Sequence, residues 1–308
     1  MRKMCHELQV METLRHRMNL SEENEERYQF LKWEDYTKKK FDEQCFLYLD
    51  ENYPYVNDLW ISYDDKEDIN VGIEKFILIG HHGYLIHMHN GCFHLNTETG
   101  KWQGNPTFIS KSNFKSLQKT RNVLQHIYRE SMVNVEIDLI YLFLAPQEFK
   151  TESILPGKII KYEDIELWLC DLQKEQNKSL PITQPTTYAM DWARELELYS
   201  TEPSLSKMKL DLSEKELLKK GICCDDCHFI DMSEVSVGDE NAFLCNHCGA
   251  IEPIEIAYAR TICEWGTIFN DQDLIPSELE EFFGKDLRKP YLDFVLKRHF
   301  TPIDPRTL

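Results

Sequence analysis

The spacing of hydrophobic and polar positions predicts two helices at the start of the chain. The apolar residues Leu8, Met11, Leu14 and Met18 recur every three or four positions, which places them on one face of a helix. A second helical run extends over 33–49. We therefore expect helices, and no strand, before about residue 50.

A β-hairpin is predicted from Ile73 to Asn90, where two short apolar runs meet at a His-His-Gly corner. Along a strand, successive side chains point to opposite faces. Ile86 and Met88 therefore share one face of the second strand, while His87 and His89 share the other. One face can join a core while two imidazoles project together from the opposite side.

The rest of the pattern alternates between strands and helices. Strands are predicted at 58–63, 92–95, 139–144 and 158–162, and helices at 113–128 and 162–172. The run from Leu139 to Leu144 is continuously apolar, which is typical of a buried central strand. This mixture predicts an α/β fold with a partly antiparallel sheet. Three more helices are predicted at 254–269, 277–283 and 290–300.

Composition and charge limit the classes of function. The chain has 308 residues, enough for one large domain or two ordinary ones, with 35 basic and 53 acidic residues and a net charge of −18. That charge excludes a general attraction to nucleic acid, so any such contact needs a local basic patch. The longest apolar run, Leu139 to Ala145, is far shorter than the roughly 20 residues of a membrane span. We expect a cytoplasmic protein with reduced thiols and no membrane partner.

Two Cys-x-x-Cys pairs form the strongest motif in the sequence. Cys224 and Cys227 are separated by 17 residues from Cys245 and Cys248. Two such pairs supply the tetrahedral four-sulfur shell that Zn²⁺ favours. Gly249 permits the tight turn that follows the second pair. Since the four thiolates leave no open position, we predict a structural zinc ion.

These elements divide the chain into four parts. We expect an N-terminal helical region at 1–40, an α/β domain at 41–175, a linker at 176–212, and a zinc ribbon with a helical tail at 213–308. The linker is polar and contains Pro181 and Pro185. A capping-box pattern from Ser213 to Glu216 opens the last part.

Several short motifs occur in one order along the chain: Leu14-Arg15-His16-Arg17, Asn57-Asp58-Leu59, Ile73-Glu74, Tyr84-Leu85-Ile86, the segment from Phe143 to Phe149, Gly221 to Cys224, and Ala259 to Trp265. In this order, and with the ribbon, the chain resembles bacterial NERD (nuclease-related domain) proteins that carry a C-terminal zinc ribbon. The resemblance implies a restriction-endonuclease-like fold. It also implies a Glu on an early helix, an Asp on one strand and Glu-x-Lys on the next, which together hold Mg²⁺ and activate water for phosphodiester hydrolysis.

At the positions that match this nuclease pattern, the residue types differ. Glu43 matches the helix position and Glu74 the Asp position, while His87 and His89 stand at the Glu-x-Lys positions. Mg²⁺ prefers oxygen ligands, and neutral imidazole supplies neither a carboxylate nor a fixed cation. The resemblance therefore implies an impaired centre. An active nuclease that uses Mg²⁺ or Mn²⁺ at an altered Glu/His centre stays open, because imidazole accepts ions of the Zn or Mn type.

The leading functional hypothesis is a catalytically impaired nuclease-fold module that binds DNA, RNA or a protein partner. A pure protein-interaction subunit also suits the net charge of −18. For nucleic acid, the candidate residues are in the basic tail: Arg288, Lys289, Lys297 and Arg298. The alternative for these cations is a helical cap in which they complement the helix dipole.

Overall fold

The structure is a computed structural model, and it divides into two compact units. The first unit contains Met1–Lys3 and Phe30–Leu205, and the second contains Met4–Gln29 and Ser206–Leu308. The described residues are 2–49, 53–64, 68–89, 92–96, 101–105, 107–109, 111–131, 134–144, 149–151, 157–179, 195–196, 198–201, 216–238, 240–270, 272 and 274–301. Asn90, the segment 145–148, Ser213 and most of the predicted linker lie outside them.

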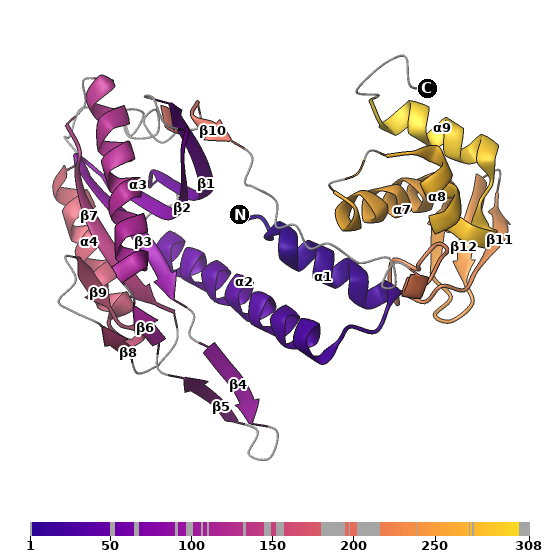
Figure 1. Cartoon of the computed structure of the whole chain (residues 1–308), viewed down its shortest axis with the longest axis horizontal. Coiled ribbons are helices and arrows are strands. Elements are labelled where there is room, and N and C mark those ends of the chain that lie inside the picture. Colours follow the sequence, from indigo (N-terminus) through magenta and orange to yellow (C-terminus); the bar gives the residue numbers. More distant parts are fainter. Residues whose placement is uncertain are drawn as a thin grey trace. The chain divides into compact units, whose positions relative to one another are not determined.

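The first unit is built on a six-stranded mixed sheet (Figure 1). In spatial order its strands are β10 (Ser200–Thr201), β1 (Tyr55–Asp64), β2 (Asp68–Ile79), β3 (His82–His89), β7 (Glu136–Phe143) and β9 (Lys158–Ile160). The neighbours from β10 to β3 are antiparallel, and β3, β7 and β9 are parallel. The predicted α/β class, the partly antiparallel sheet and the β2–β3 hairpin are confirmed.

Helices cover both faces of this sheet. The helix α3 (Lys111–Glu130) packs on one face through apolar residues such as Leu124. The C-terminal half of α2 (Glu22–Leu49) and α4 (Ile165–Ser179) pack on the other face, together with Ile86 and Met88. In the described part of the chain, no helix combines the length and apolar character that crossing a membrane requires.

Four short strands form two small sheets in addition to the main one. β4 (Cys92–Asn96) pairs with β5 (Lys101–Asn105) in an antiparallel arrangement. β6 (Thr107–Ile109) pairs in parallel with β8 (Phe149–Thr151).

At one position in the main sheet, successive side chains do not alternate regularly between its two faces. Ile73 and Phe76 are three residues apart on β2, yet both contact the core on the α3 side. On β1, Asp58 has a φ of 49°, in the left-handed region that few non-glycine residues adopt. The paired register includes the residues on either side of Asp58 and Glu74 but not these two. The sheet is therefore locally irregular where Glu74 lies, although the register is the same on both sides of this position.

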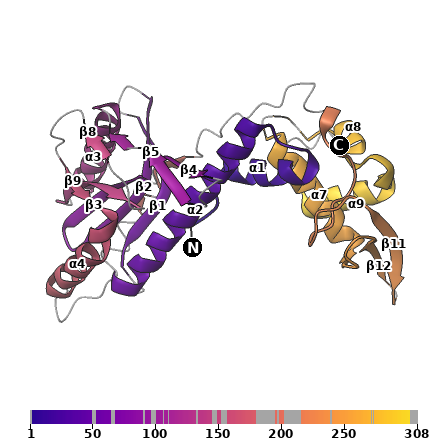
Figure 2. The same cartoon turned by 90° about the horizontal axis from the view of Figure 1, so that it is seen from below.

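The second unit combines the ribbon with helices from both ends of the chain (Figure 2). Its elements are α1 (His6–Arg17), β11 (Met232–Val237), β12 (Glu240–Cys245), β13 (Ile251–Pro253), α7 (Ile254–Ile268), α8 (Pro276–Phe283) and α9 (Lys289–His299). Leu14 of α1 shares a buried core with Trp265 of α7 and Leu292 of α9. The N-terminal helical region is thus not a separate part, because α1 belongs to the core of the ribbon unit.

The predicted linker also contains folded residues. The helix α4 extends to Ser179, beyond the predicted start of the linker. Leu196 is fully buried in the core of the first unit, and Thr201 pairs with Trp60 of β1. Residues 195–196 and 198–201 therefore belong to the sheet domain, although the polar composition around them predicts a linker.

Candidate functional sites

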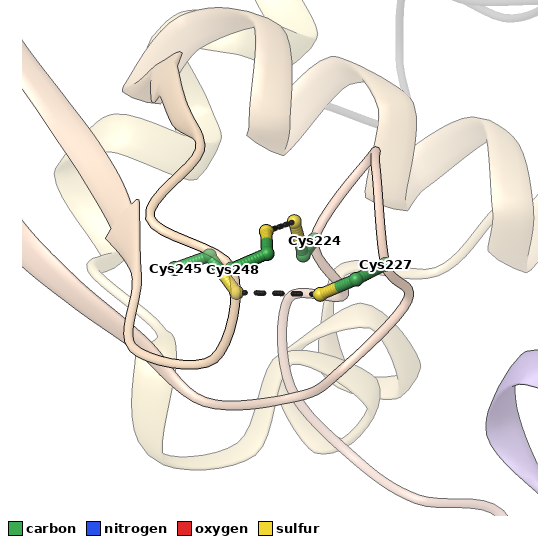
Figure 3. A group of neighbouring side chains, drawn as sticks. All are labelled: Cys224, Cys227, Cys245 and Cys248. Atoms are coloured by element: carbon green, nitrogen blue, oxygen red, sulfur yellow. Dashed lines mark hydrogen bonds between the residues drawn. The ribbon is translucent and has the colours of Figure 1, made fainter.

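The four predicted cysteines converge on one point (Figure 3). Their Sγ atoms all lie within 4.8 Å of one another, and the Sγ atoms of Cys224 and Cys248, like those of Cys227 and Cys245, are 3.5 Å apart. Zinc–sulfur bonds of about 2.3 Å in a tetrahedron place sulfurs roughly 3.8 Å apart. The four side chains therefore fit a four-sulfur metal shell and can hold an ion such as Zn²⁺.

Each cysteine pair is turned by the same backbone hydrogen bond. The N–H of His228 donates to the carbonyl of Cys224 at 3.0 Å, and the N–H of Gly249 donates to the carbonyl of Cys245 at 2.9 Å. Both donors have a positive φ, 60° for His228 and 79° for Gly249. Glycine adopts this conformation without steric cost, whereas His228 is an exception that the sequence does not reveal. The ring of His16 stacks on that of His228 at 3.5 Å.

The surroundings of the cysteines favour the thiolate at one position. Burial raises the pKa of the Cys245 thiol, but the backbone N–H groups of Cys248 and His247 and the neighbouring thiols lower it to about 7. A thiolate is the form that binds a metal ion. Since the protein fills all four positions, the site suits a structural ion and leaves none for a substrate.

A buried network of ion pairs holds the backbone just before the first cysteine pair. The side chain of Arg17 is fully buried, and its guanidinium bonds to Oε2 of Glu264 at 2.5 and 3.0 Å. The other oxygen of Glu264 accepts a hydrogen bond from Arg260 at 2.8 Å. Arg260 also donates to the carbonyl of Cys223 at 2.6 Å, and Arg17 donates to that of Gly221 at 3.1 Å. This network joins α1, α7 and the backbone that leads into Cys224.

The second site lies on the sheet, where Glu74 of β2 meets His87 of β3. Oε2 of Glu74 is 3.0 Å from Nδ1 of His87 and accepts the backbone N–H of Met88 at 2.6 Å. Burial alone would raise the pKa of Glu74, but the hydrogen bond and charge of His87, with Lys38 and the Met88 N–H, lower it to about 2. Glu74 is therefore a carboxylate whose Oε2 already has two donors.

The two histidines of β3 lie together but differ in charge. Their ring centroids are 4.5 Å apart. Burial by itself lowers the pKa of His87, but the hydrogen bond and charge of Glu74 raise it above its usual value. Burial, followed by the charge of His87, lowers the pKa of His89 to about 4. His89 is therefore neutral near pH 7, while His87 is drawn toward the imidazolium form.

Glu43, the predicted helix ligand, does not belong to this group. Its side chain is 65% exposed and pairs with Lys40 at 2.6 Å. The α2 residues whose charges act on His87 are instead Lys38 and Glu34, which pair with each other at 2.6 Å. Burial lowers the pKa of Lys38, but Glu74 and Glu34 raise it above its usual value, so it is a cation. The structure thus brings together Glu74, His87 and His89 without Glu43.

The residue before Glu43 is buried in a neighbouring polar cluster, whose Arg2 also donates to the backbone carbonyl of Glu74 at 3.3 Å. Asp42 accepts hydrogen bonds from Nζ of Lys75 at 2.7 Å and from Nε of Arg2 at 3.0 Å. Arg2 also bonds to Asp58 at 2.8 Å, and its side chain is 2% exposed. This cluster joins the N-terminus, α2 and the first two strands of the sheet, and every one of its charges is paired.

Three of the four tail cations proposed for nucleic-acid contact form ion pairs. Arg288 pairs with Glu234, Lys289 with Glu280 at 2.7 Å, and Arg298 with Glu255 at 3.2 Å. Lys297 is exposed and has no ion pair among the described residues. The tail is therefore a largely neutralised surface and not a free basic patch.

No protein-family model, no curated protein and no solved structure matches the chain. The function is therefore inferred from the geometry of the two sites.

Proposed function

We propose that this protein is a NERD-like, nuclease-related protein whose first unit keeps a restriction-endonuclease-like scaffold but acts by binding instead of hydrolysis. The mixed sheet supports this proposal, because Glu74 and His87, at two positions of the nuclease pattern, lie side by side on adjacent strands. The four-cysteine site would stabilise the second unit, as metal binding and folding are coupled in such modules.

The pairing of Glu74 with His87 is the observation that most supports a loss of Mg²⁺-dependent hydrolysis. Mg²⁺ requires several oxygen ligands in octahedral geometry. Oε2 of Glu74, however, accepts two N–H groups, and the imidazole 3.0 Å away has a raised pKa that favours its positive form. A cation beside the carboxylate opposes the entry of a second cation. With Glu43 turned to solvent, Glu74 is the one carboxylate retained here from the four matched positions.

The charge distribution favours a protein partner over nucleic acid. The chain has a net charge of −18, and three of the four candidate tail cations are already paired with carboxylates. If the tail touches phosphates, replacing Lys297 and Arg298 with Ala should lower the log–log salt slope of DNA binding by about two. We expect weak binding at low salt with a smaller change in slope, since Arg298 must first give up Glu255.

A cleavage assay tests the loss of hydrolysis. Supercoiled plasmid and single-stranded DNA are incubated with the zinc-loaded full chain in Mg²⁺, beside the Glu74→Ala variant. We expect no cleavage above that of the variant. Robust Mg²⁺-dependent cleavage by the unmodified chain, abolished in Glu74→Ala, would refute the proposal.

A second candidate, a nuclease that uses a transition metal, is favoured by one observation. The nuclease pattern has a lysine where this chain has His89, so the matched position lacks a fixed cation. Lys38 supplies one from α2, and its charge lowers the pKa of Glu74. If Mn²⁺ supports cleavage, the Lys38→Ala variant should lose it, while Lys40→Ala, which removes an exposed lysine of the same helix, should keep it. Equal activity in both variants would exclude a role for Lys38.

A further inference from the structure

Two polar atoms at the histidine site are buried without partners in the described part of the protein. They are Nε2 of His89 and the hydroxyl of Tyr141. Tyr141 is fully buried on β7, and its ring centroid lies 6.3 Å from that of His89 and 6.2 Å from that of His87. Buried polar groups are almost always hydrogen-bonded, so two such atoms on neighbouring rings indicate that something else satisfies them.

The neighbouring imidazole is prepared to bind a metal ion. In the neutral ring whose Nδ1–H donates a hydrogen bond to Glu74, the nitrogen with the free lone pair is Nε2. A carboxylate that holds one ring nitrogen while the other binds a metal is a common outer-shell arrangement, and it fixes both the tautomer and the ring orientation. The ring of His89 stacks against those of Tyr141 and Phe143, with centroids at 6.3 and 5.4 Å. Both imidazoles are therefore held in place by their surroundings.

We propose that His87 and His89 bind a divalent transition-metal ion such as Ni²⁺, Co²⁺ or Zn²⁺ through their Nε2 atoms, at a site separate from the four cysteines. Glu74 orients His87, and the hydroxyl of Tyr141 hydrogen-bonds to a water molecule on the ion. Imidazole selects ions of this class over Mg²⁺ and Ca²⁺. The site requires neither nuclease activity nor nucleic acid.

Access and charge are consistent with this assignment. The side chains of His87 and Glu74 are 24% and 33% exposed, so an ion can enter from solvent. Of the charges that act most strongly on His87, two are the carboxylates Glu74 and Glu34 and one is the cation Lys38. Binding of the ion displaces the second proton of His87, so the ring then carries no charge that opposes the ion. An ion bound to Nε2 of His87 leaves the hydrogen bond between Nδ1 and Glu74 intact.

Calorimetric titration of the zinc-loaded full chain with NiCl₂ tests the proposal. We expect one Ni²⁺ per chain, with no release of zinc from the cysteines. His89→Ala should weaken the affinity at least tenfold, and Glu74→Gln should weaken it roughly 10- to 100-fold, as loss of an outer-shell partner does. His126→Ala is the matched control, since His126 also pairs with a glutamate, at 3.2 Å, but lies on α3. This control should bind like the unmodified chain.

Two results would overturn the proposal. The first is the absence of saturable binding, which would mean that ordered water satisfies His89 and Tyr141. The second is Ni²⁺ binding that survives both His89→Ala and His87→Ala. If a histidine variant fails to fold, Tyr141→Phe provides the second test, because it keeps the ring and removes only the hydroxyl. It should weaken binding measurably, and unchanged affinity would count against the predicted water contact.

Discussion

The charge of Glu74 should control the protonation of His87, and the variant Glu74→Gln isolates that effect. Glutamine keeps the shape of the side chain and can still accept the hydrogen bond from His87, but it carries no charge. A hydrogen bond to a charged group contributes about 1.5–3 kcal/mol, and one pH unit corresponds to about 1.4 kcal/mol. The side chains are 24% and 33% exposed, so screening favours the lower half of this range. Loss of the Glu74 charge should therefore lower the pKa of His87.

The direction of this change in the pKa of His87 follows from the other groups that act on it. In the absence of the Glu74 charge, burial and the charge of Lys38 both lower the pKa of His87, so it should titrate below its ordinary 6.5. In the unmodified chain, the raised pKa of His87 and the lowered pKa of Glu74 mean that this pair stabilises the fold most between about pH 4.5 and 6.5. The contribution is lost as pH rises through the folded-state pKa of His87 and as pH falls through that of Glu74.

Side-chain NMR of the imidazoles, recorded as a function of pH on both proteins, measures this change directly. His89, with a pKa of about 4, should stay neutral above pH 5 in both and serves as the internal reference. An identical pKa of His87 in the two proteins would refute the assigned pairing.

Three further variants test the supports of each unit. Cys245→Ser should release the metal ion and unfold the ribbon, which elemental analysis and circular dichroism will show; full metal retention would contradict the four-sulfur site. Arg17→Ala removes one partner of Glu264 in a buried network and should lower the free energy of unfolding, measured by chemical denaturation, by about 3–5 kcal/mol. Arg15→Ala, at a side chain that is 43% exposed, should lower it by under about 1 kcal/mol. Arg2→Ala should destabilise the sheet unit by about 3 kcal/mol in the same assay, while Lys3→Ala at an exposed position should not; equal effects of both would count against the buried pairing with Asp42.

Short-range patterns were sufficient where one strand or one turn fixes the geometry. The strict alternation along β3 predicted that His87 and His89 share a face, and their rings do lie 4.5 Å apart. The two Cys-x-x-Cys pairs predicted a convergent four-sulfur site, which the Sγ distances confirm.

It was harder to predict which side chains of a helix face the sheet. Glu34, Lys38 and Asp42 recur every four residues and share one face of α2, whereas Glu43 is rotated by about 100° from Asp42. A match that is off by one residue therefore selects an exposed side chain. The spacing of four was visible in the sequence, but the direction of that face depends on how α2 packs on the sheet.

Contacts between distant parts of the chain were beyond local patterns. Nothing near Arg17 indicates that it pairs with Glu264, 247 residues away, and nothing near Arg2 indicates its contact with Asp42. The assignment of α1 to the ribbon unit, and of Leu196 and Thr201 to the sheet domain, depends on such packing. Boundaries drawn from composition alone therefore differ from those of the folded units.

Isothermal titration calorimetry of the zinc-loaded full chain with Mg²⁺, run beside the Glu74→Gln variant, shows whether Glu74 can still bind a hard metal ion. Because Oε2 of Glu74 accepts hydrogen bonds from His87 and Met88, we expect no saturable one-site heat in either protein. A stoichiometric Mg²⁺ site in the unmodified chain that disappears in Glu74→Gln would contradict this expectation.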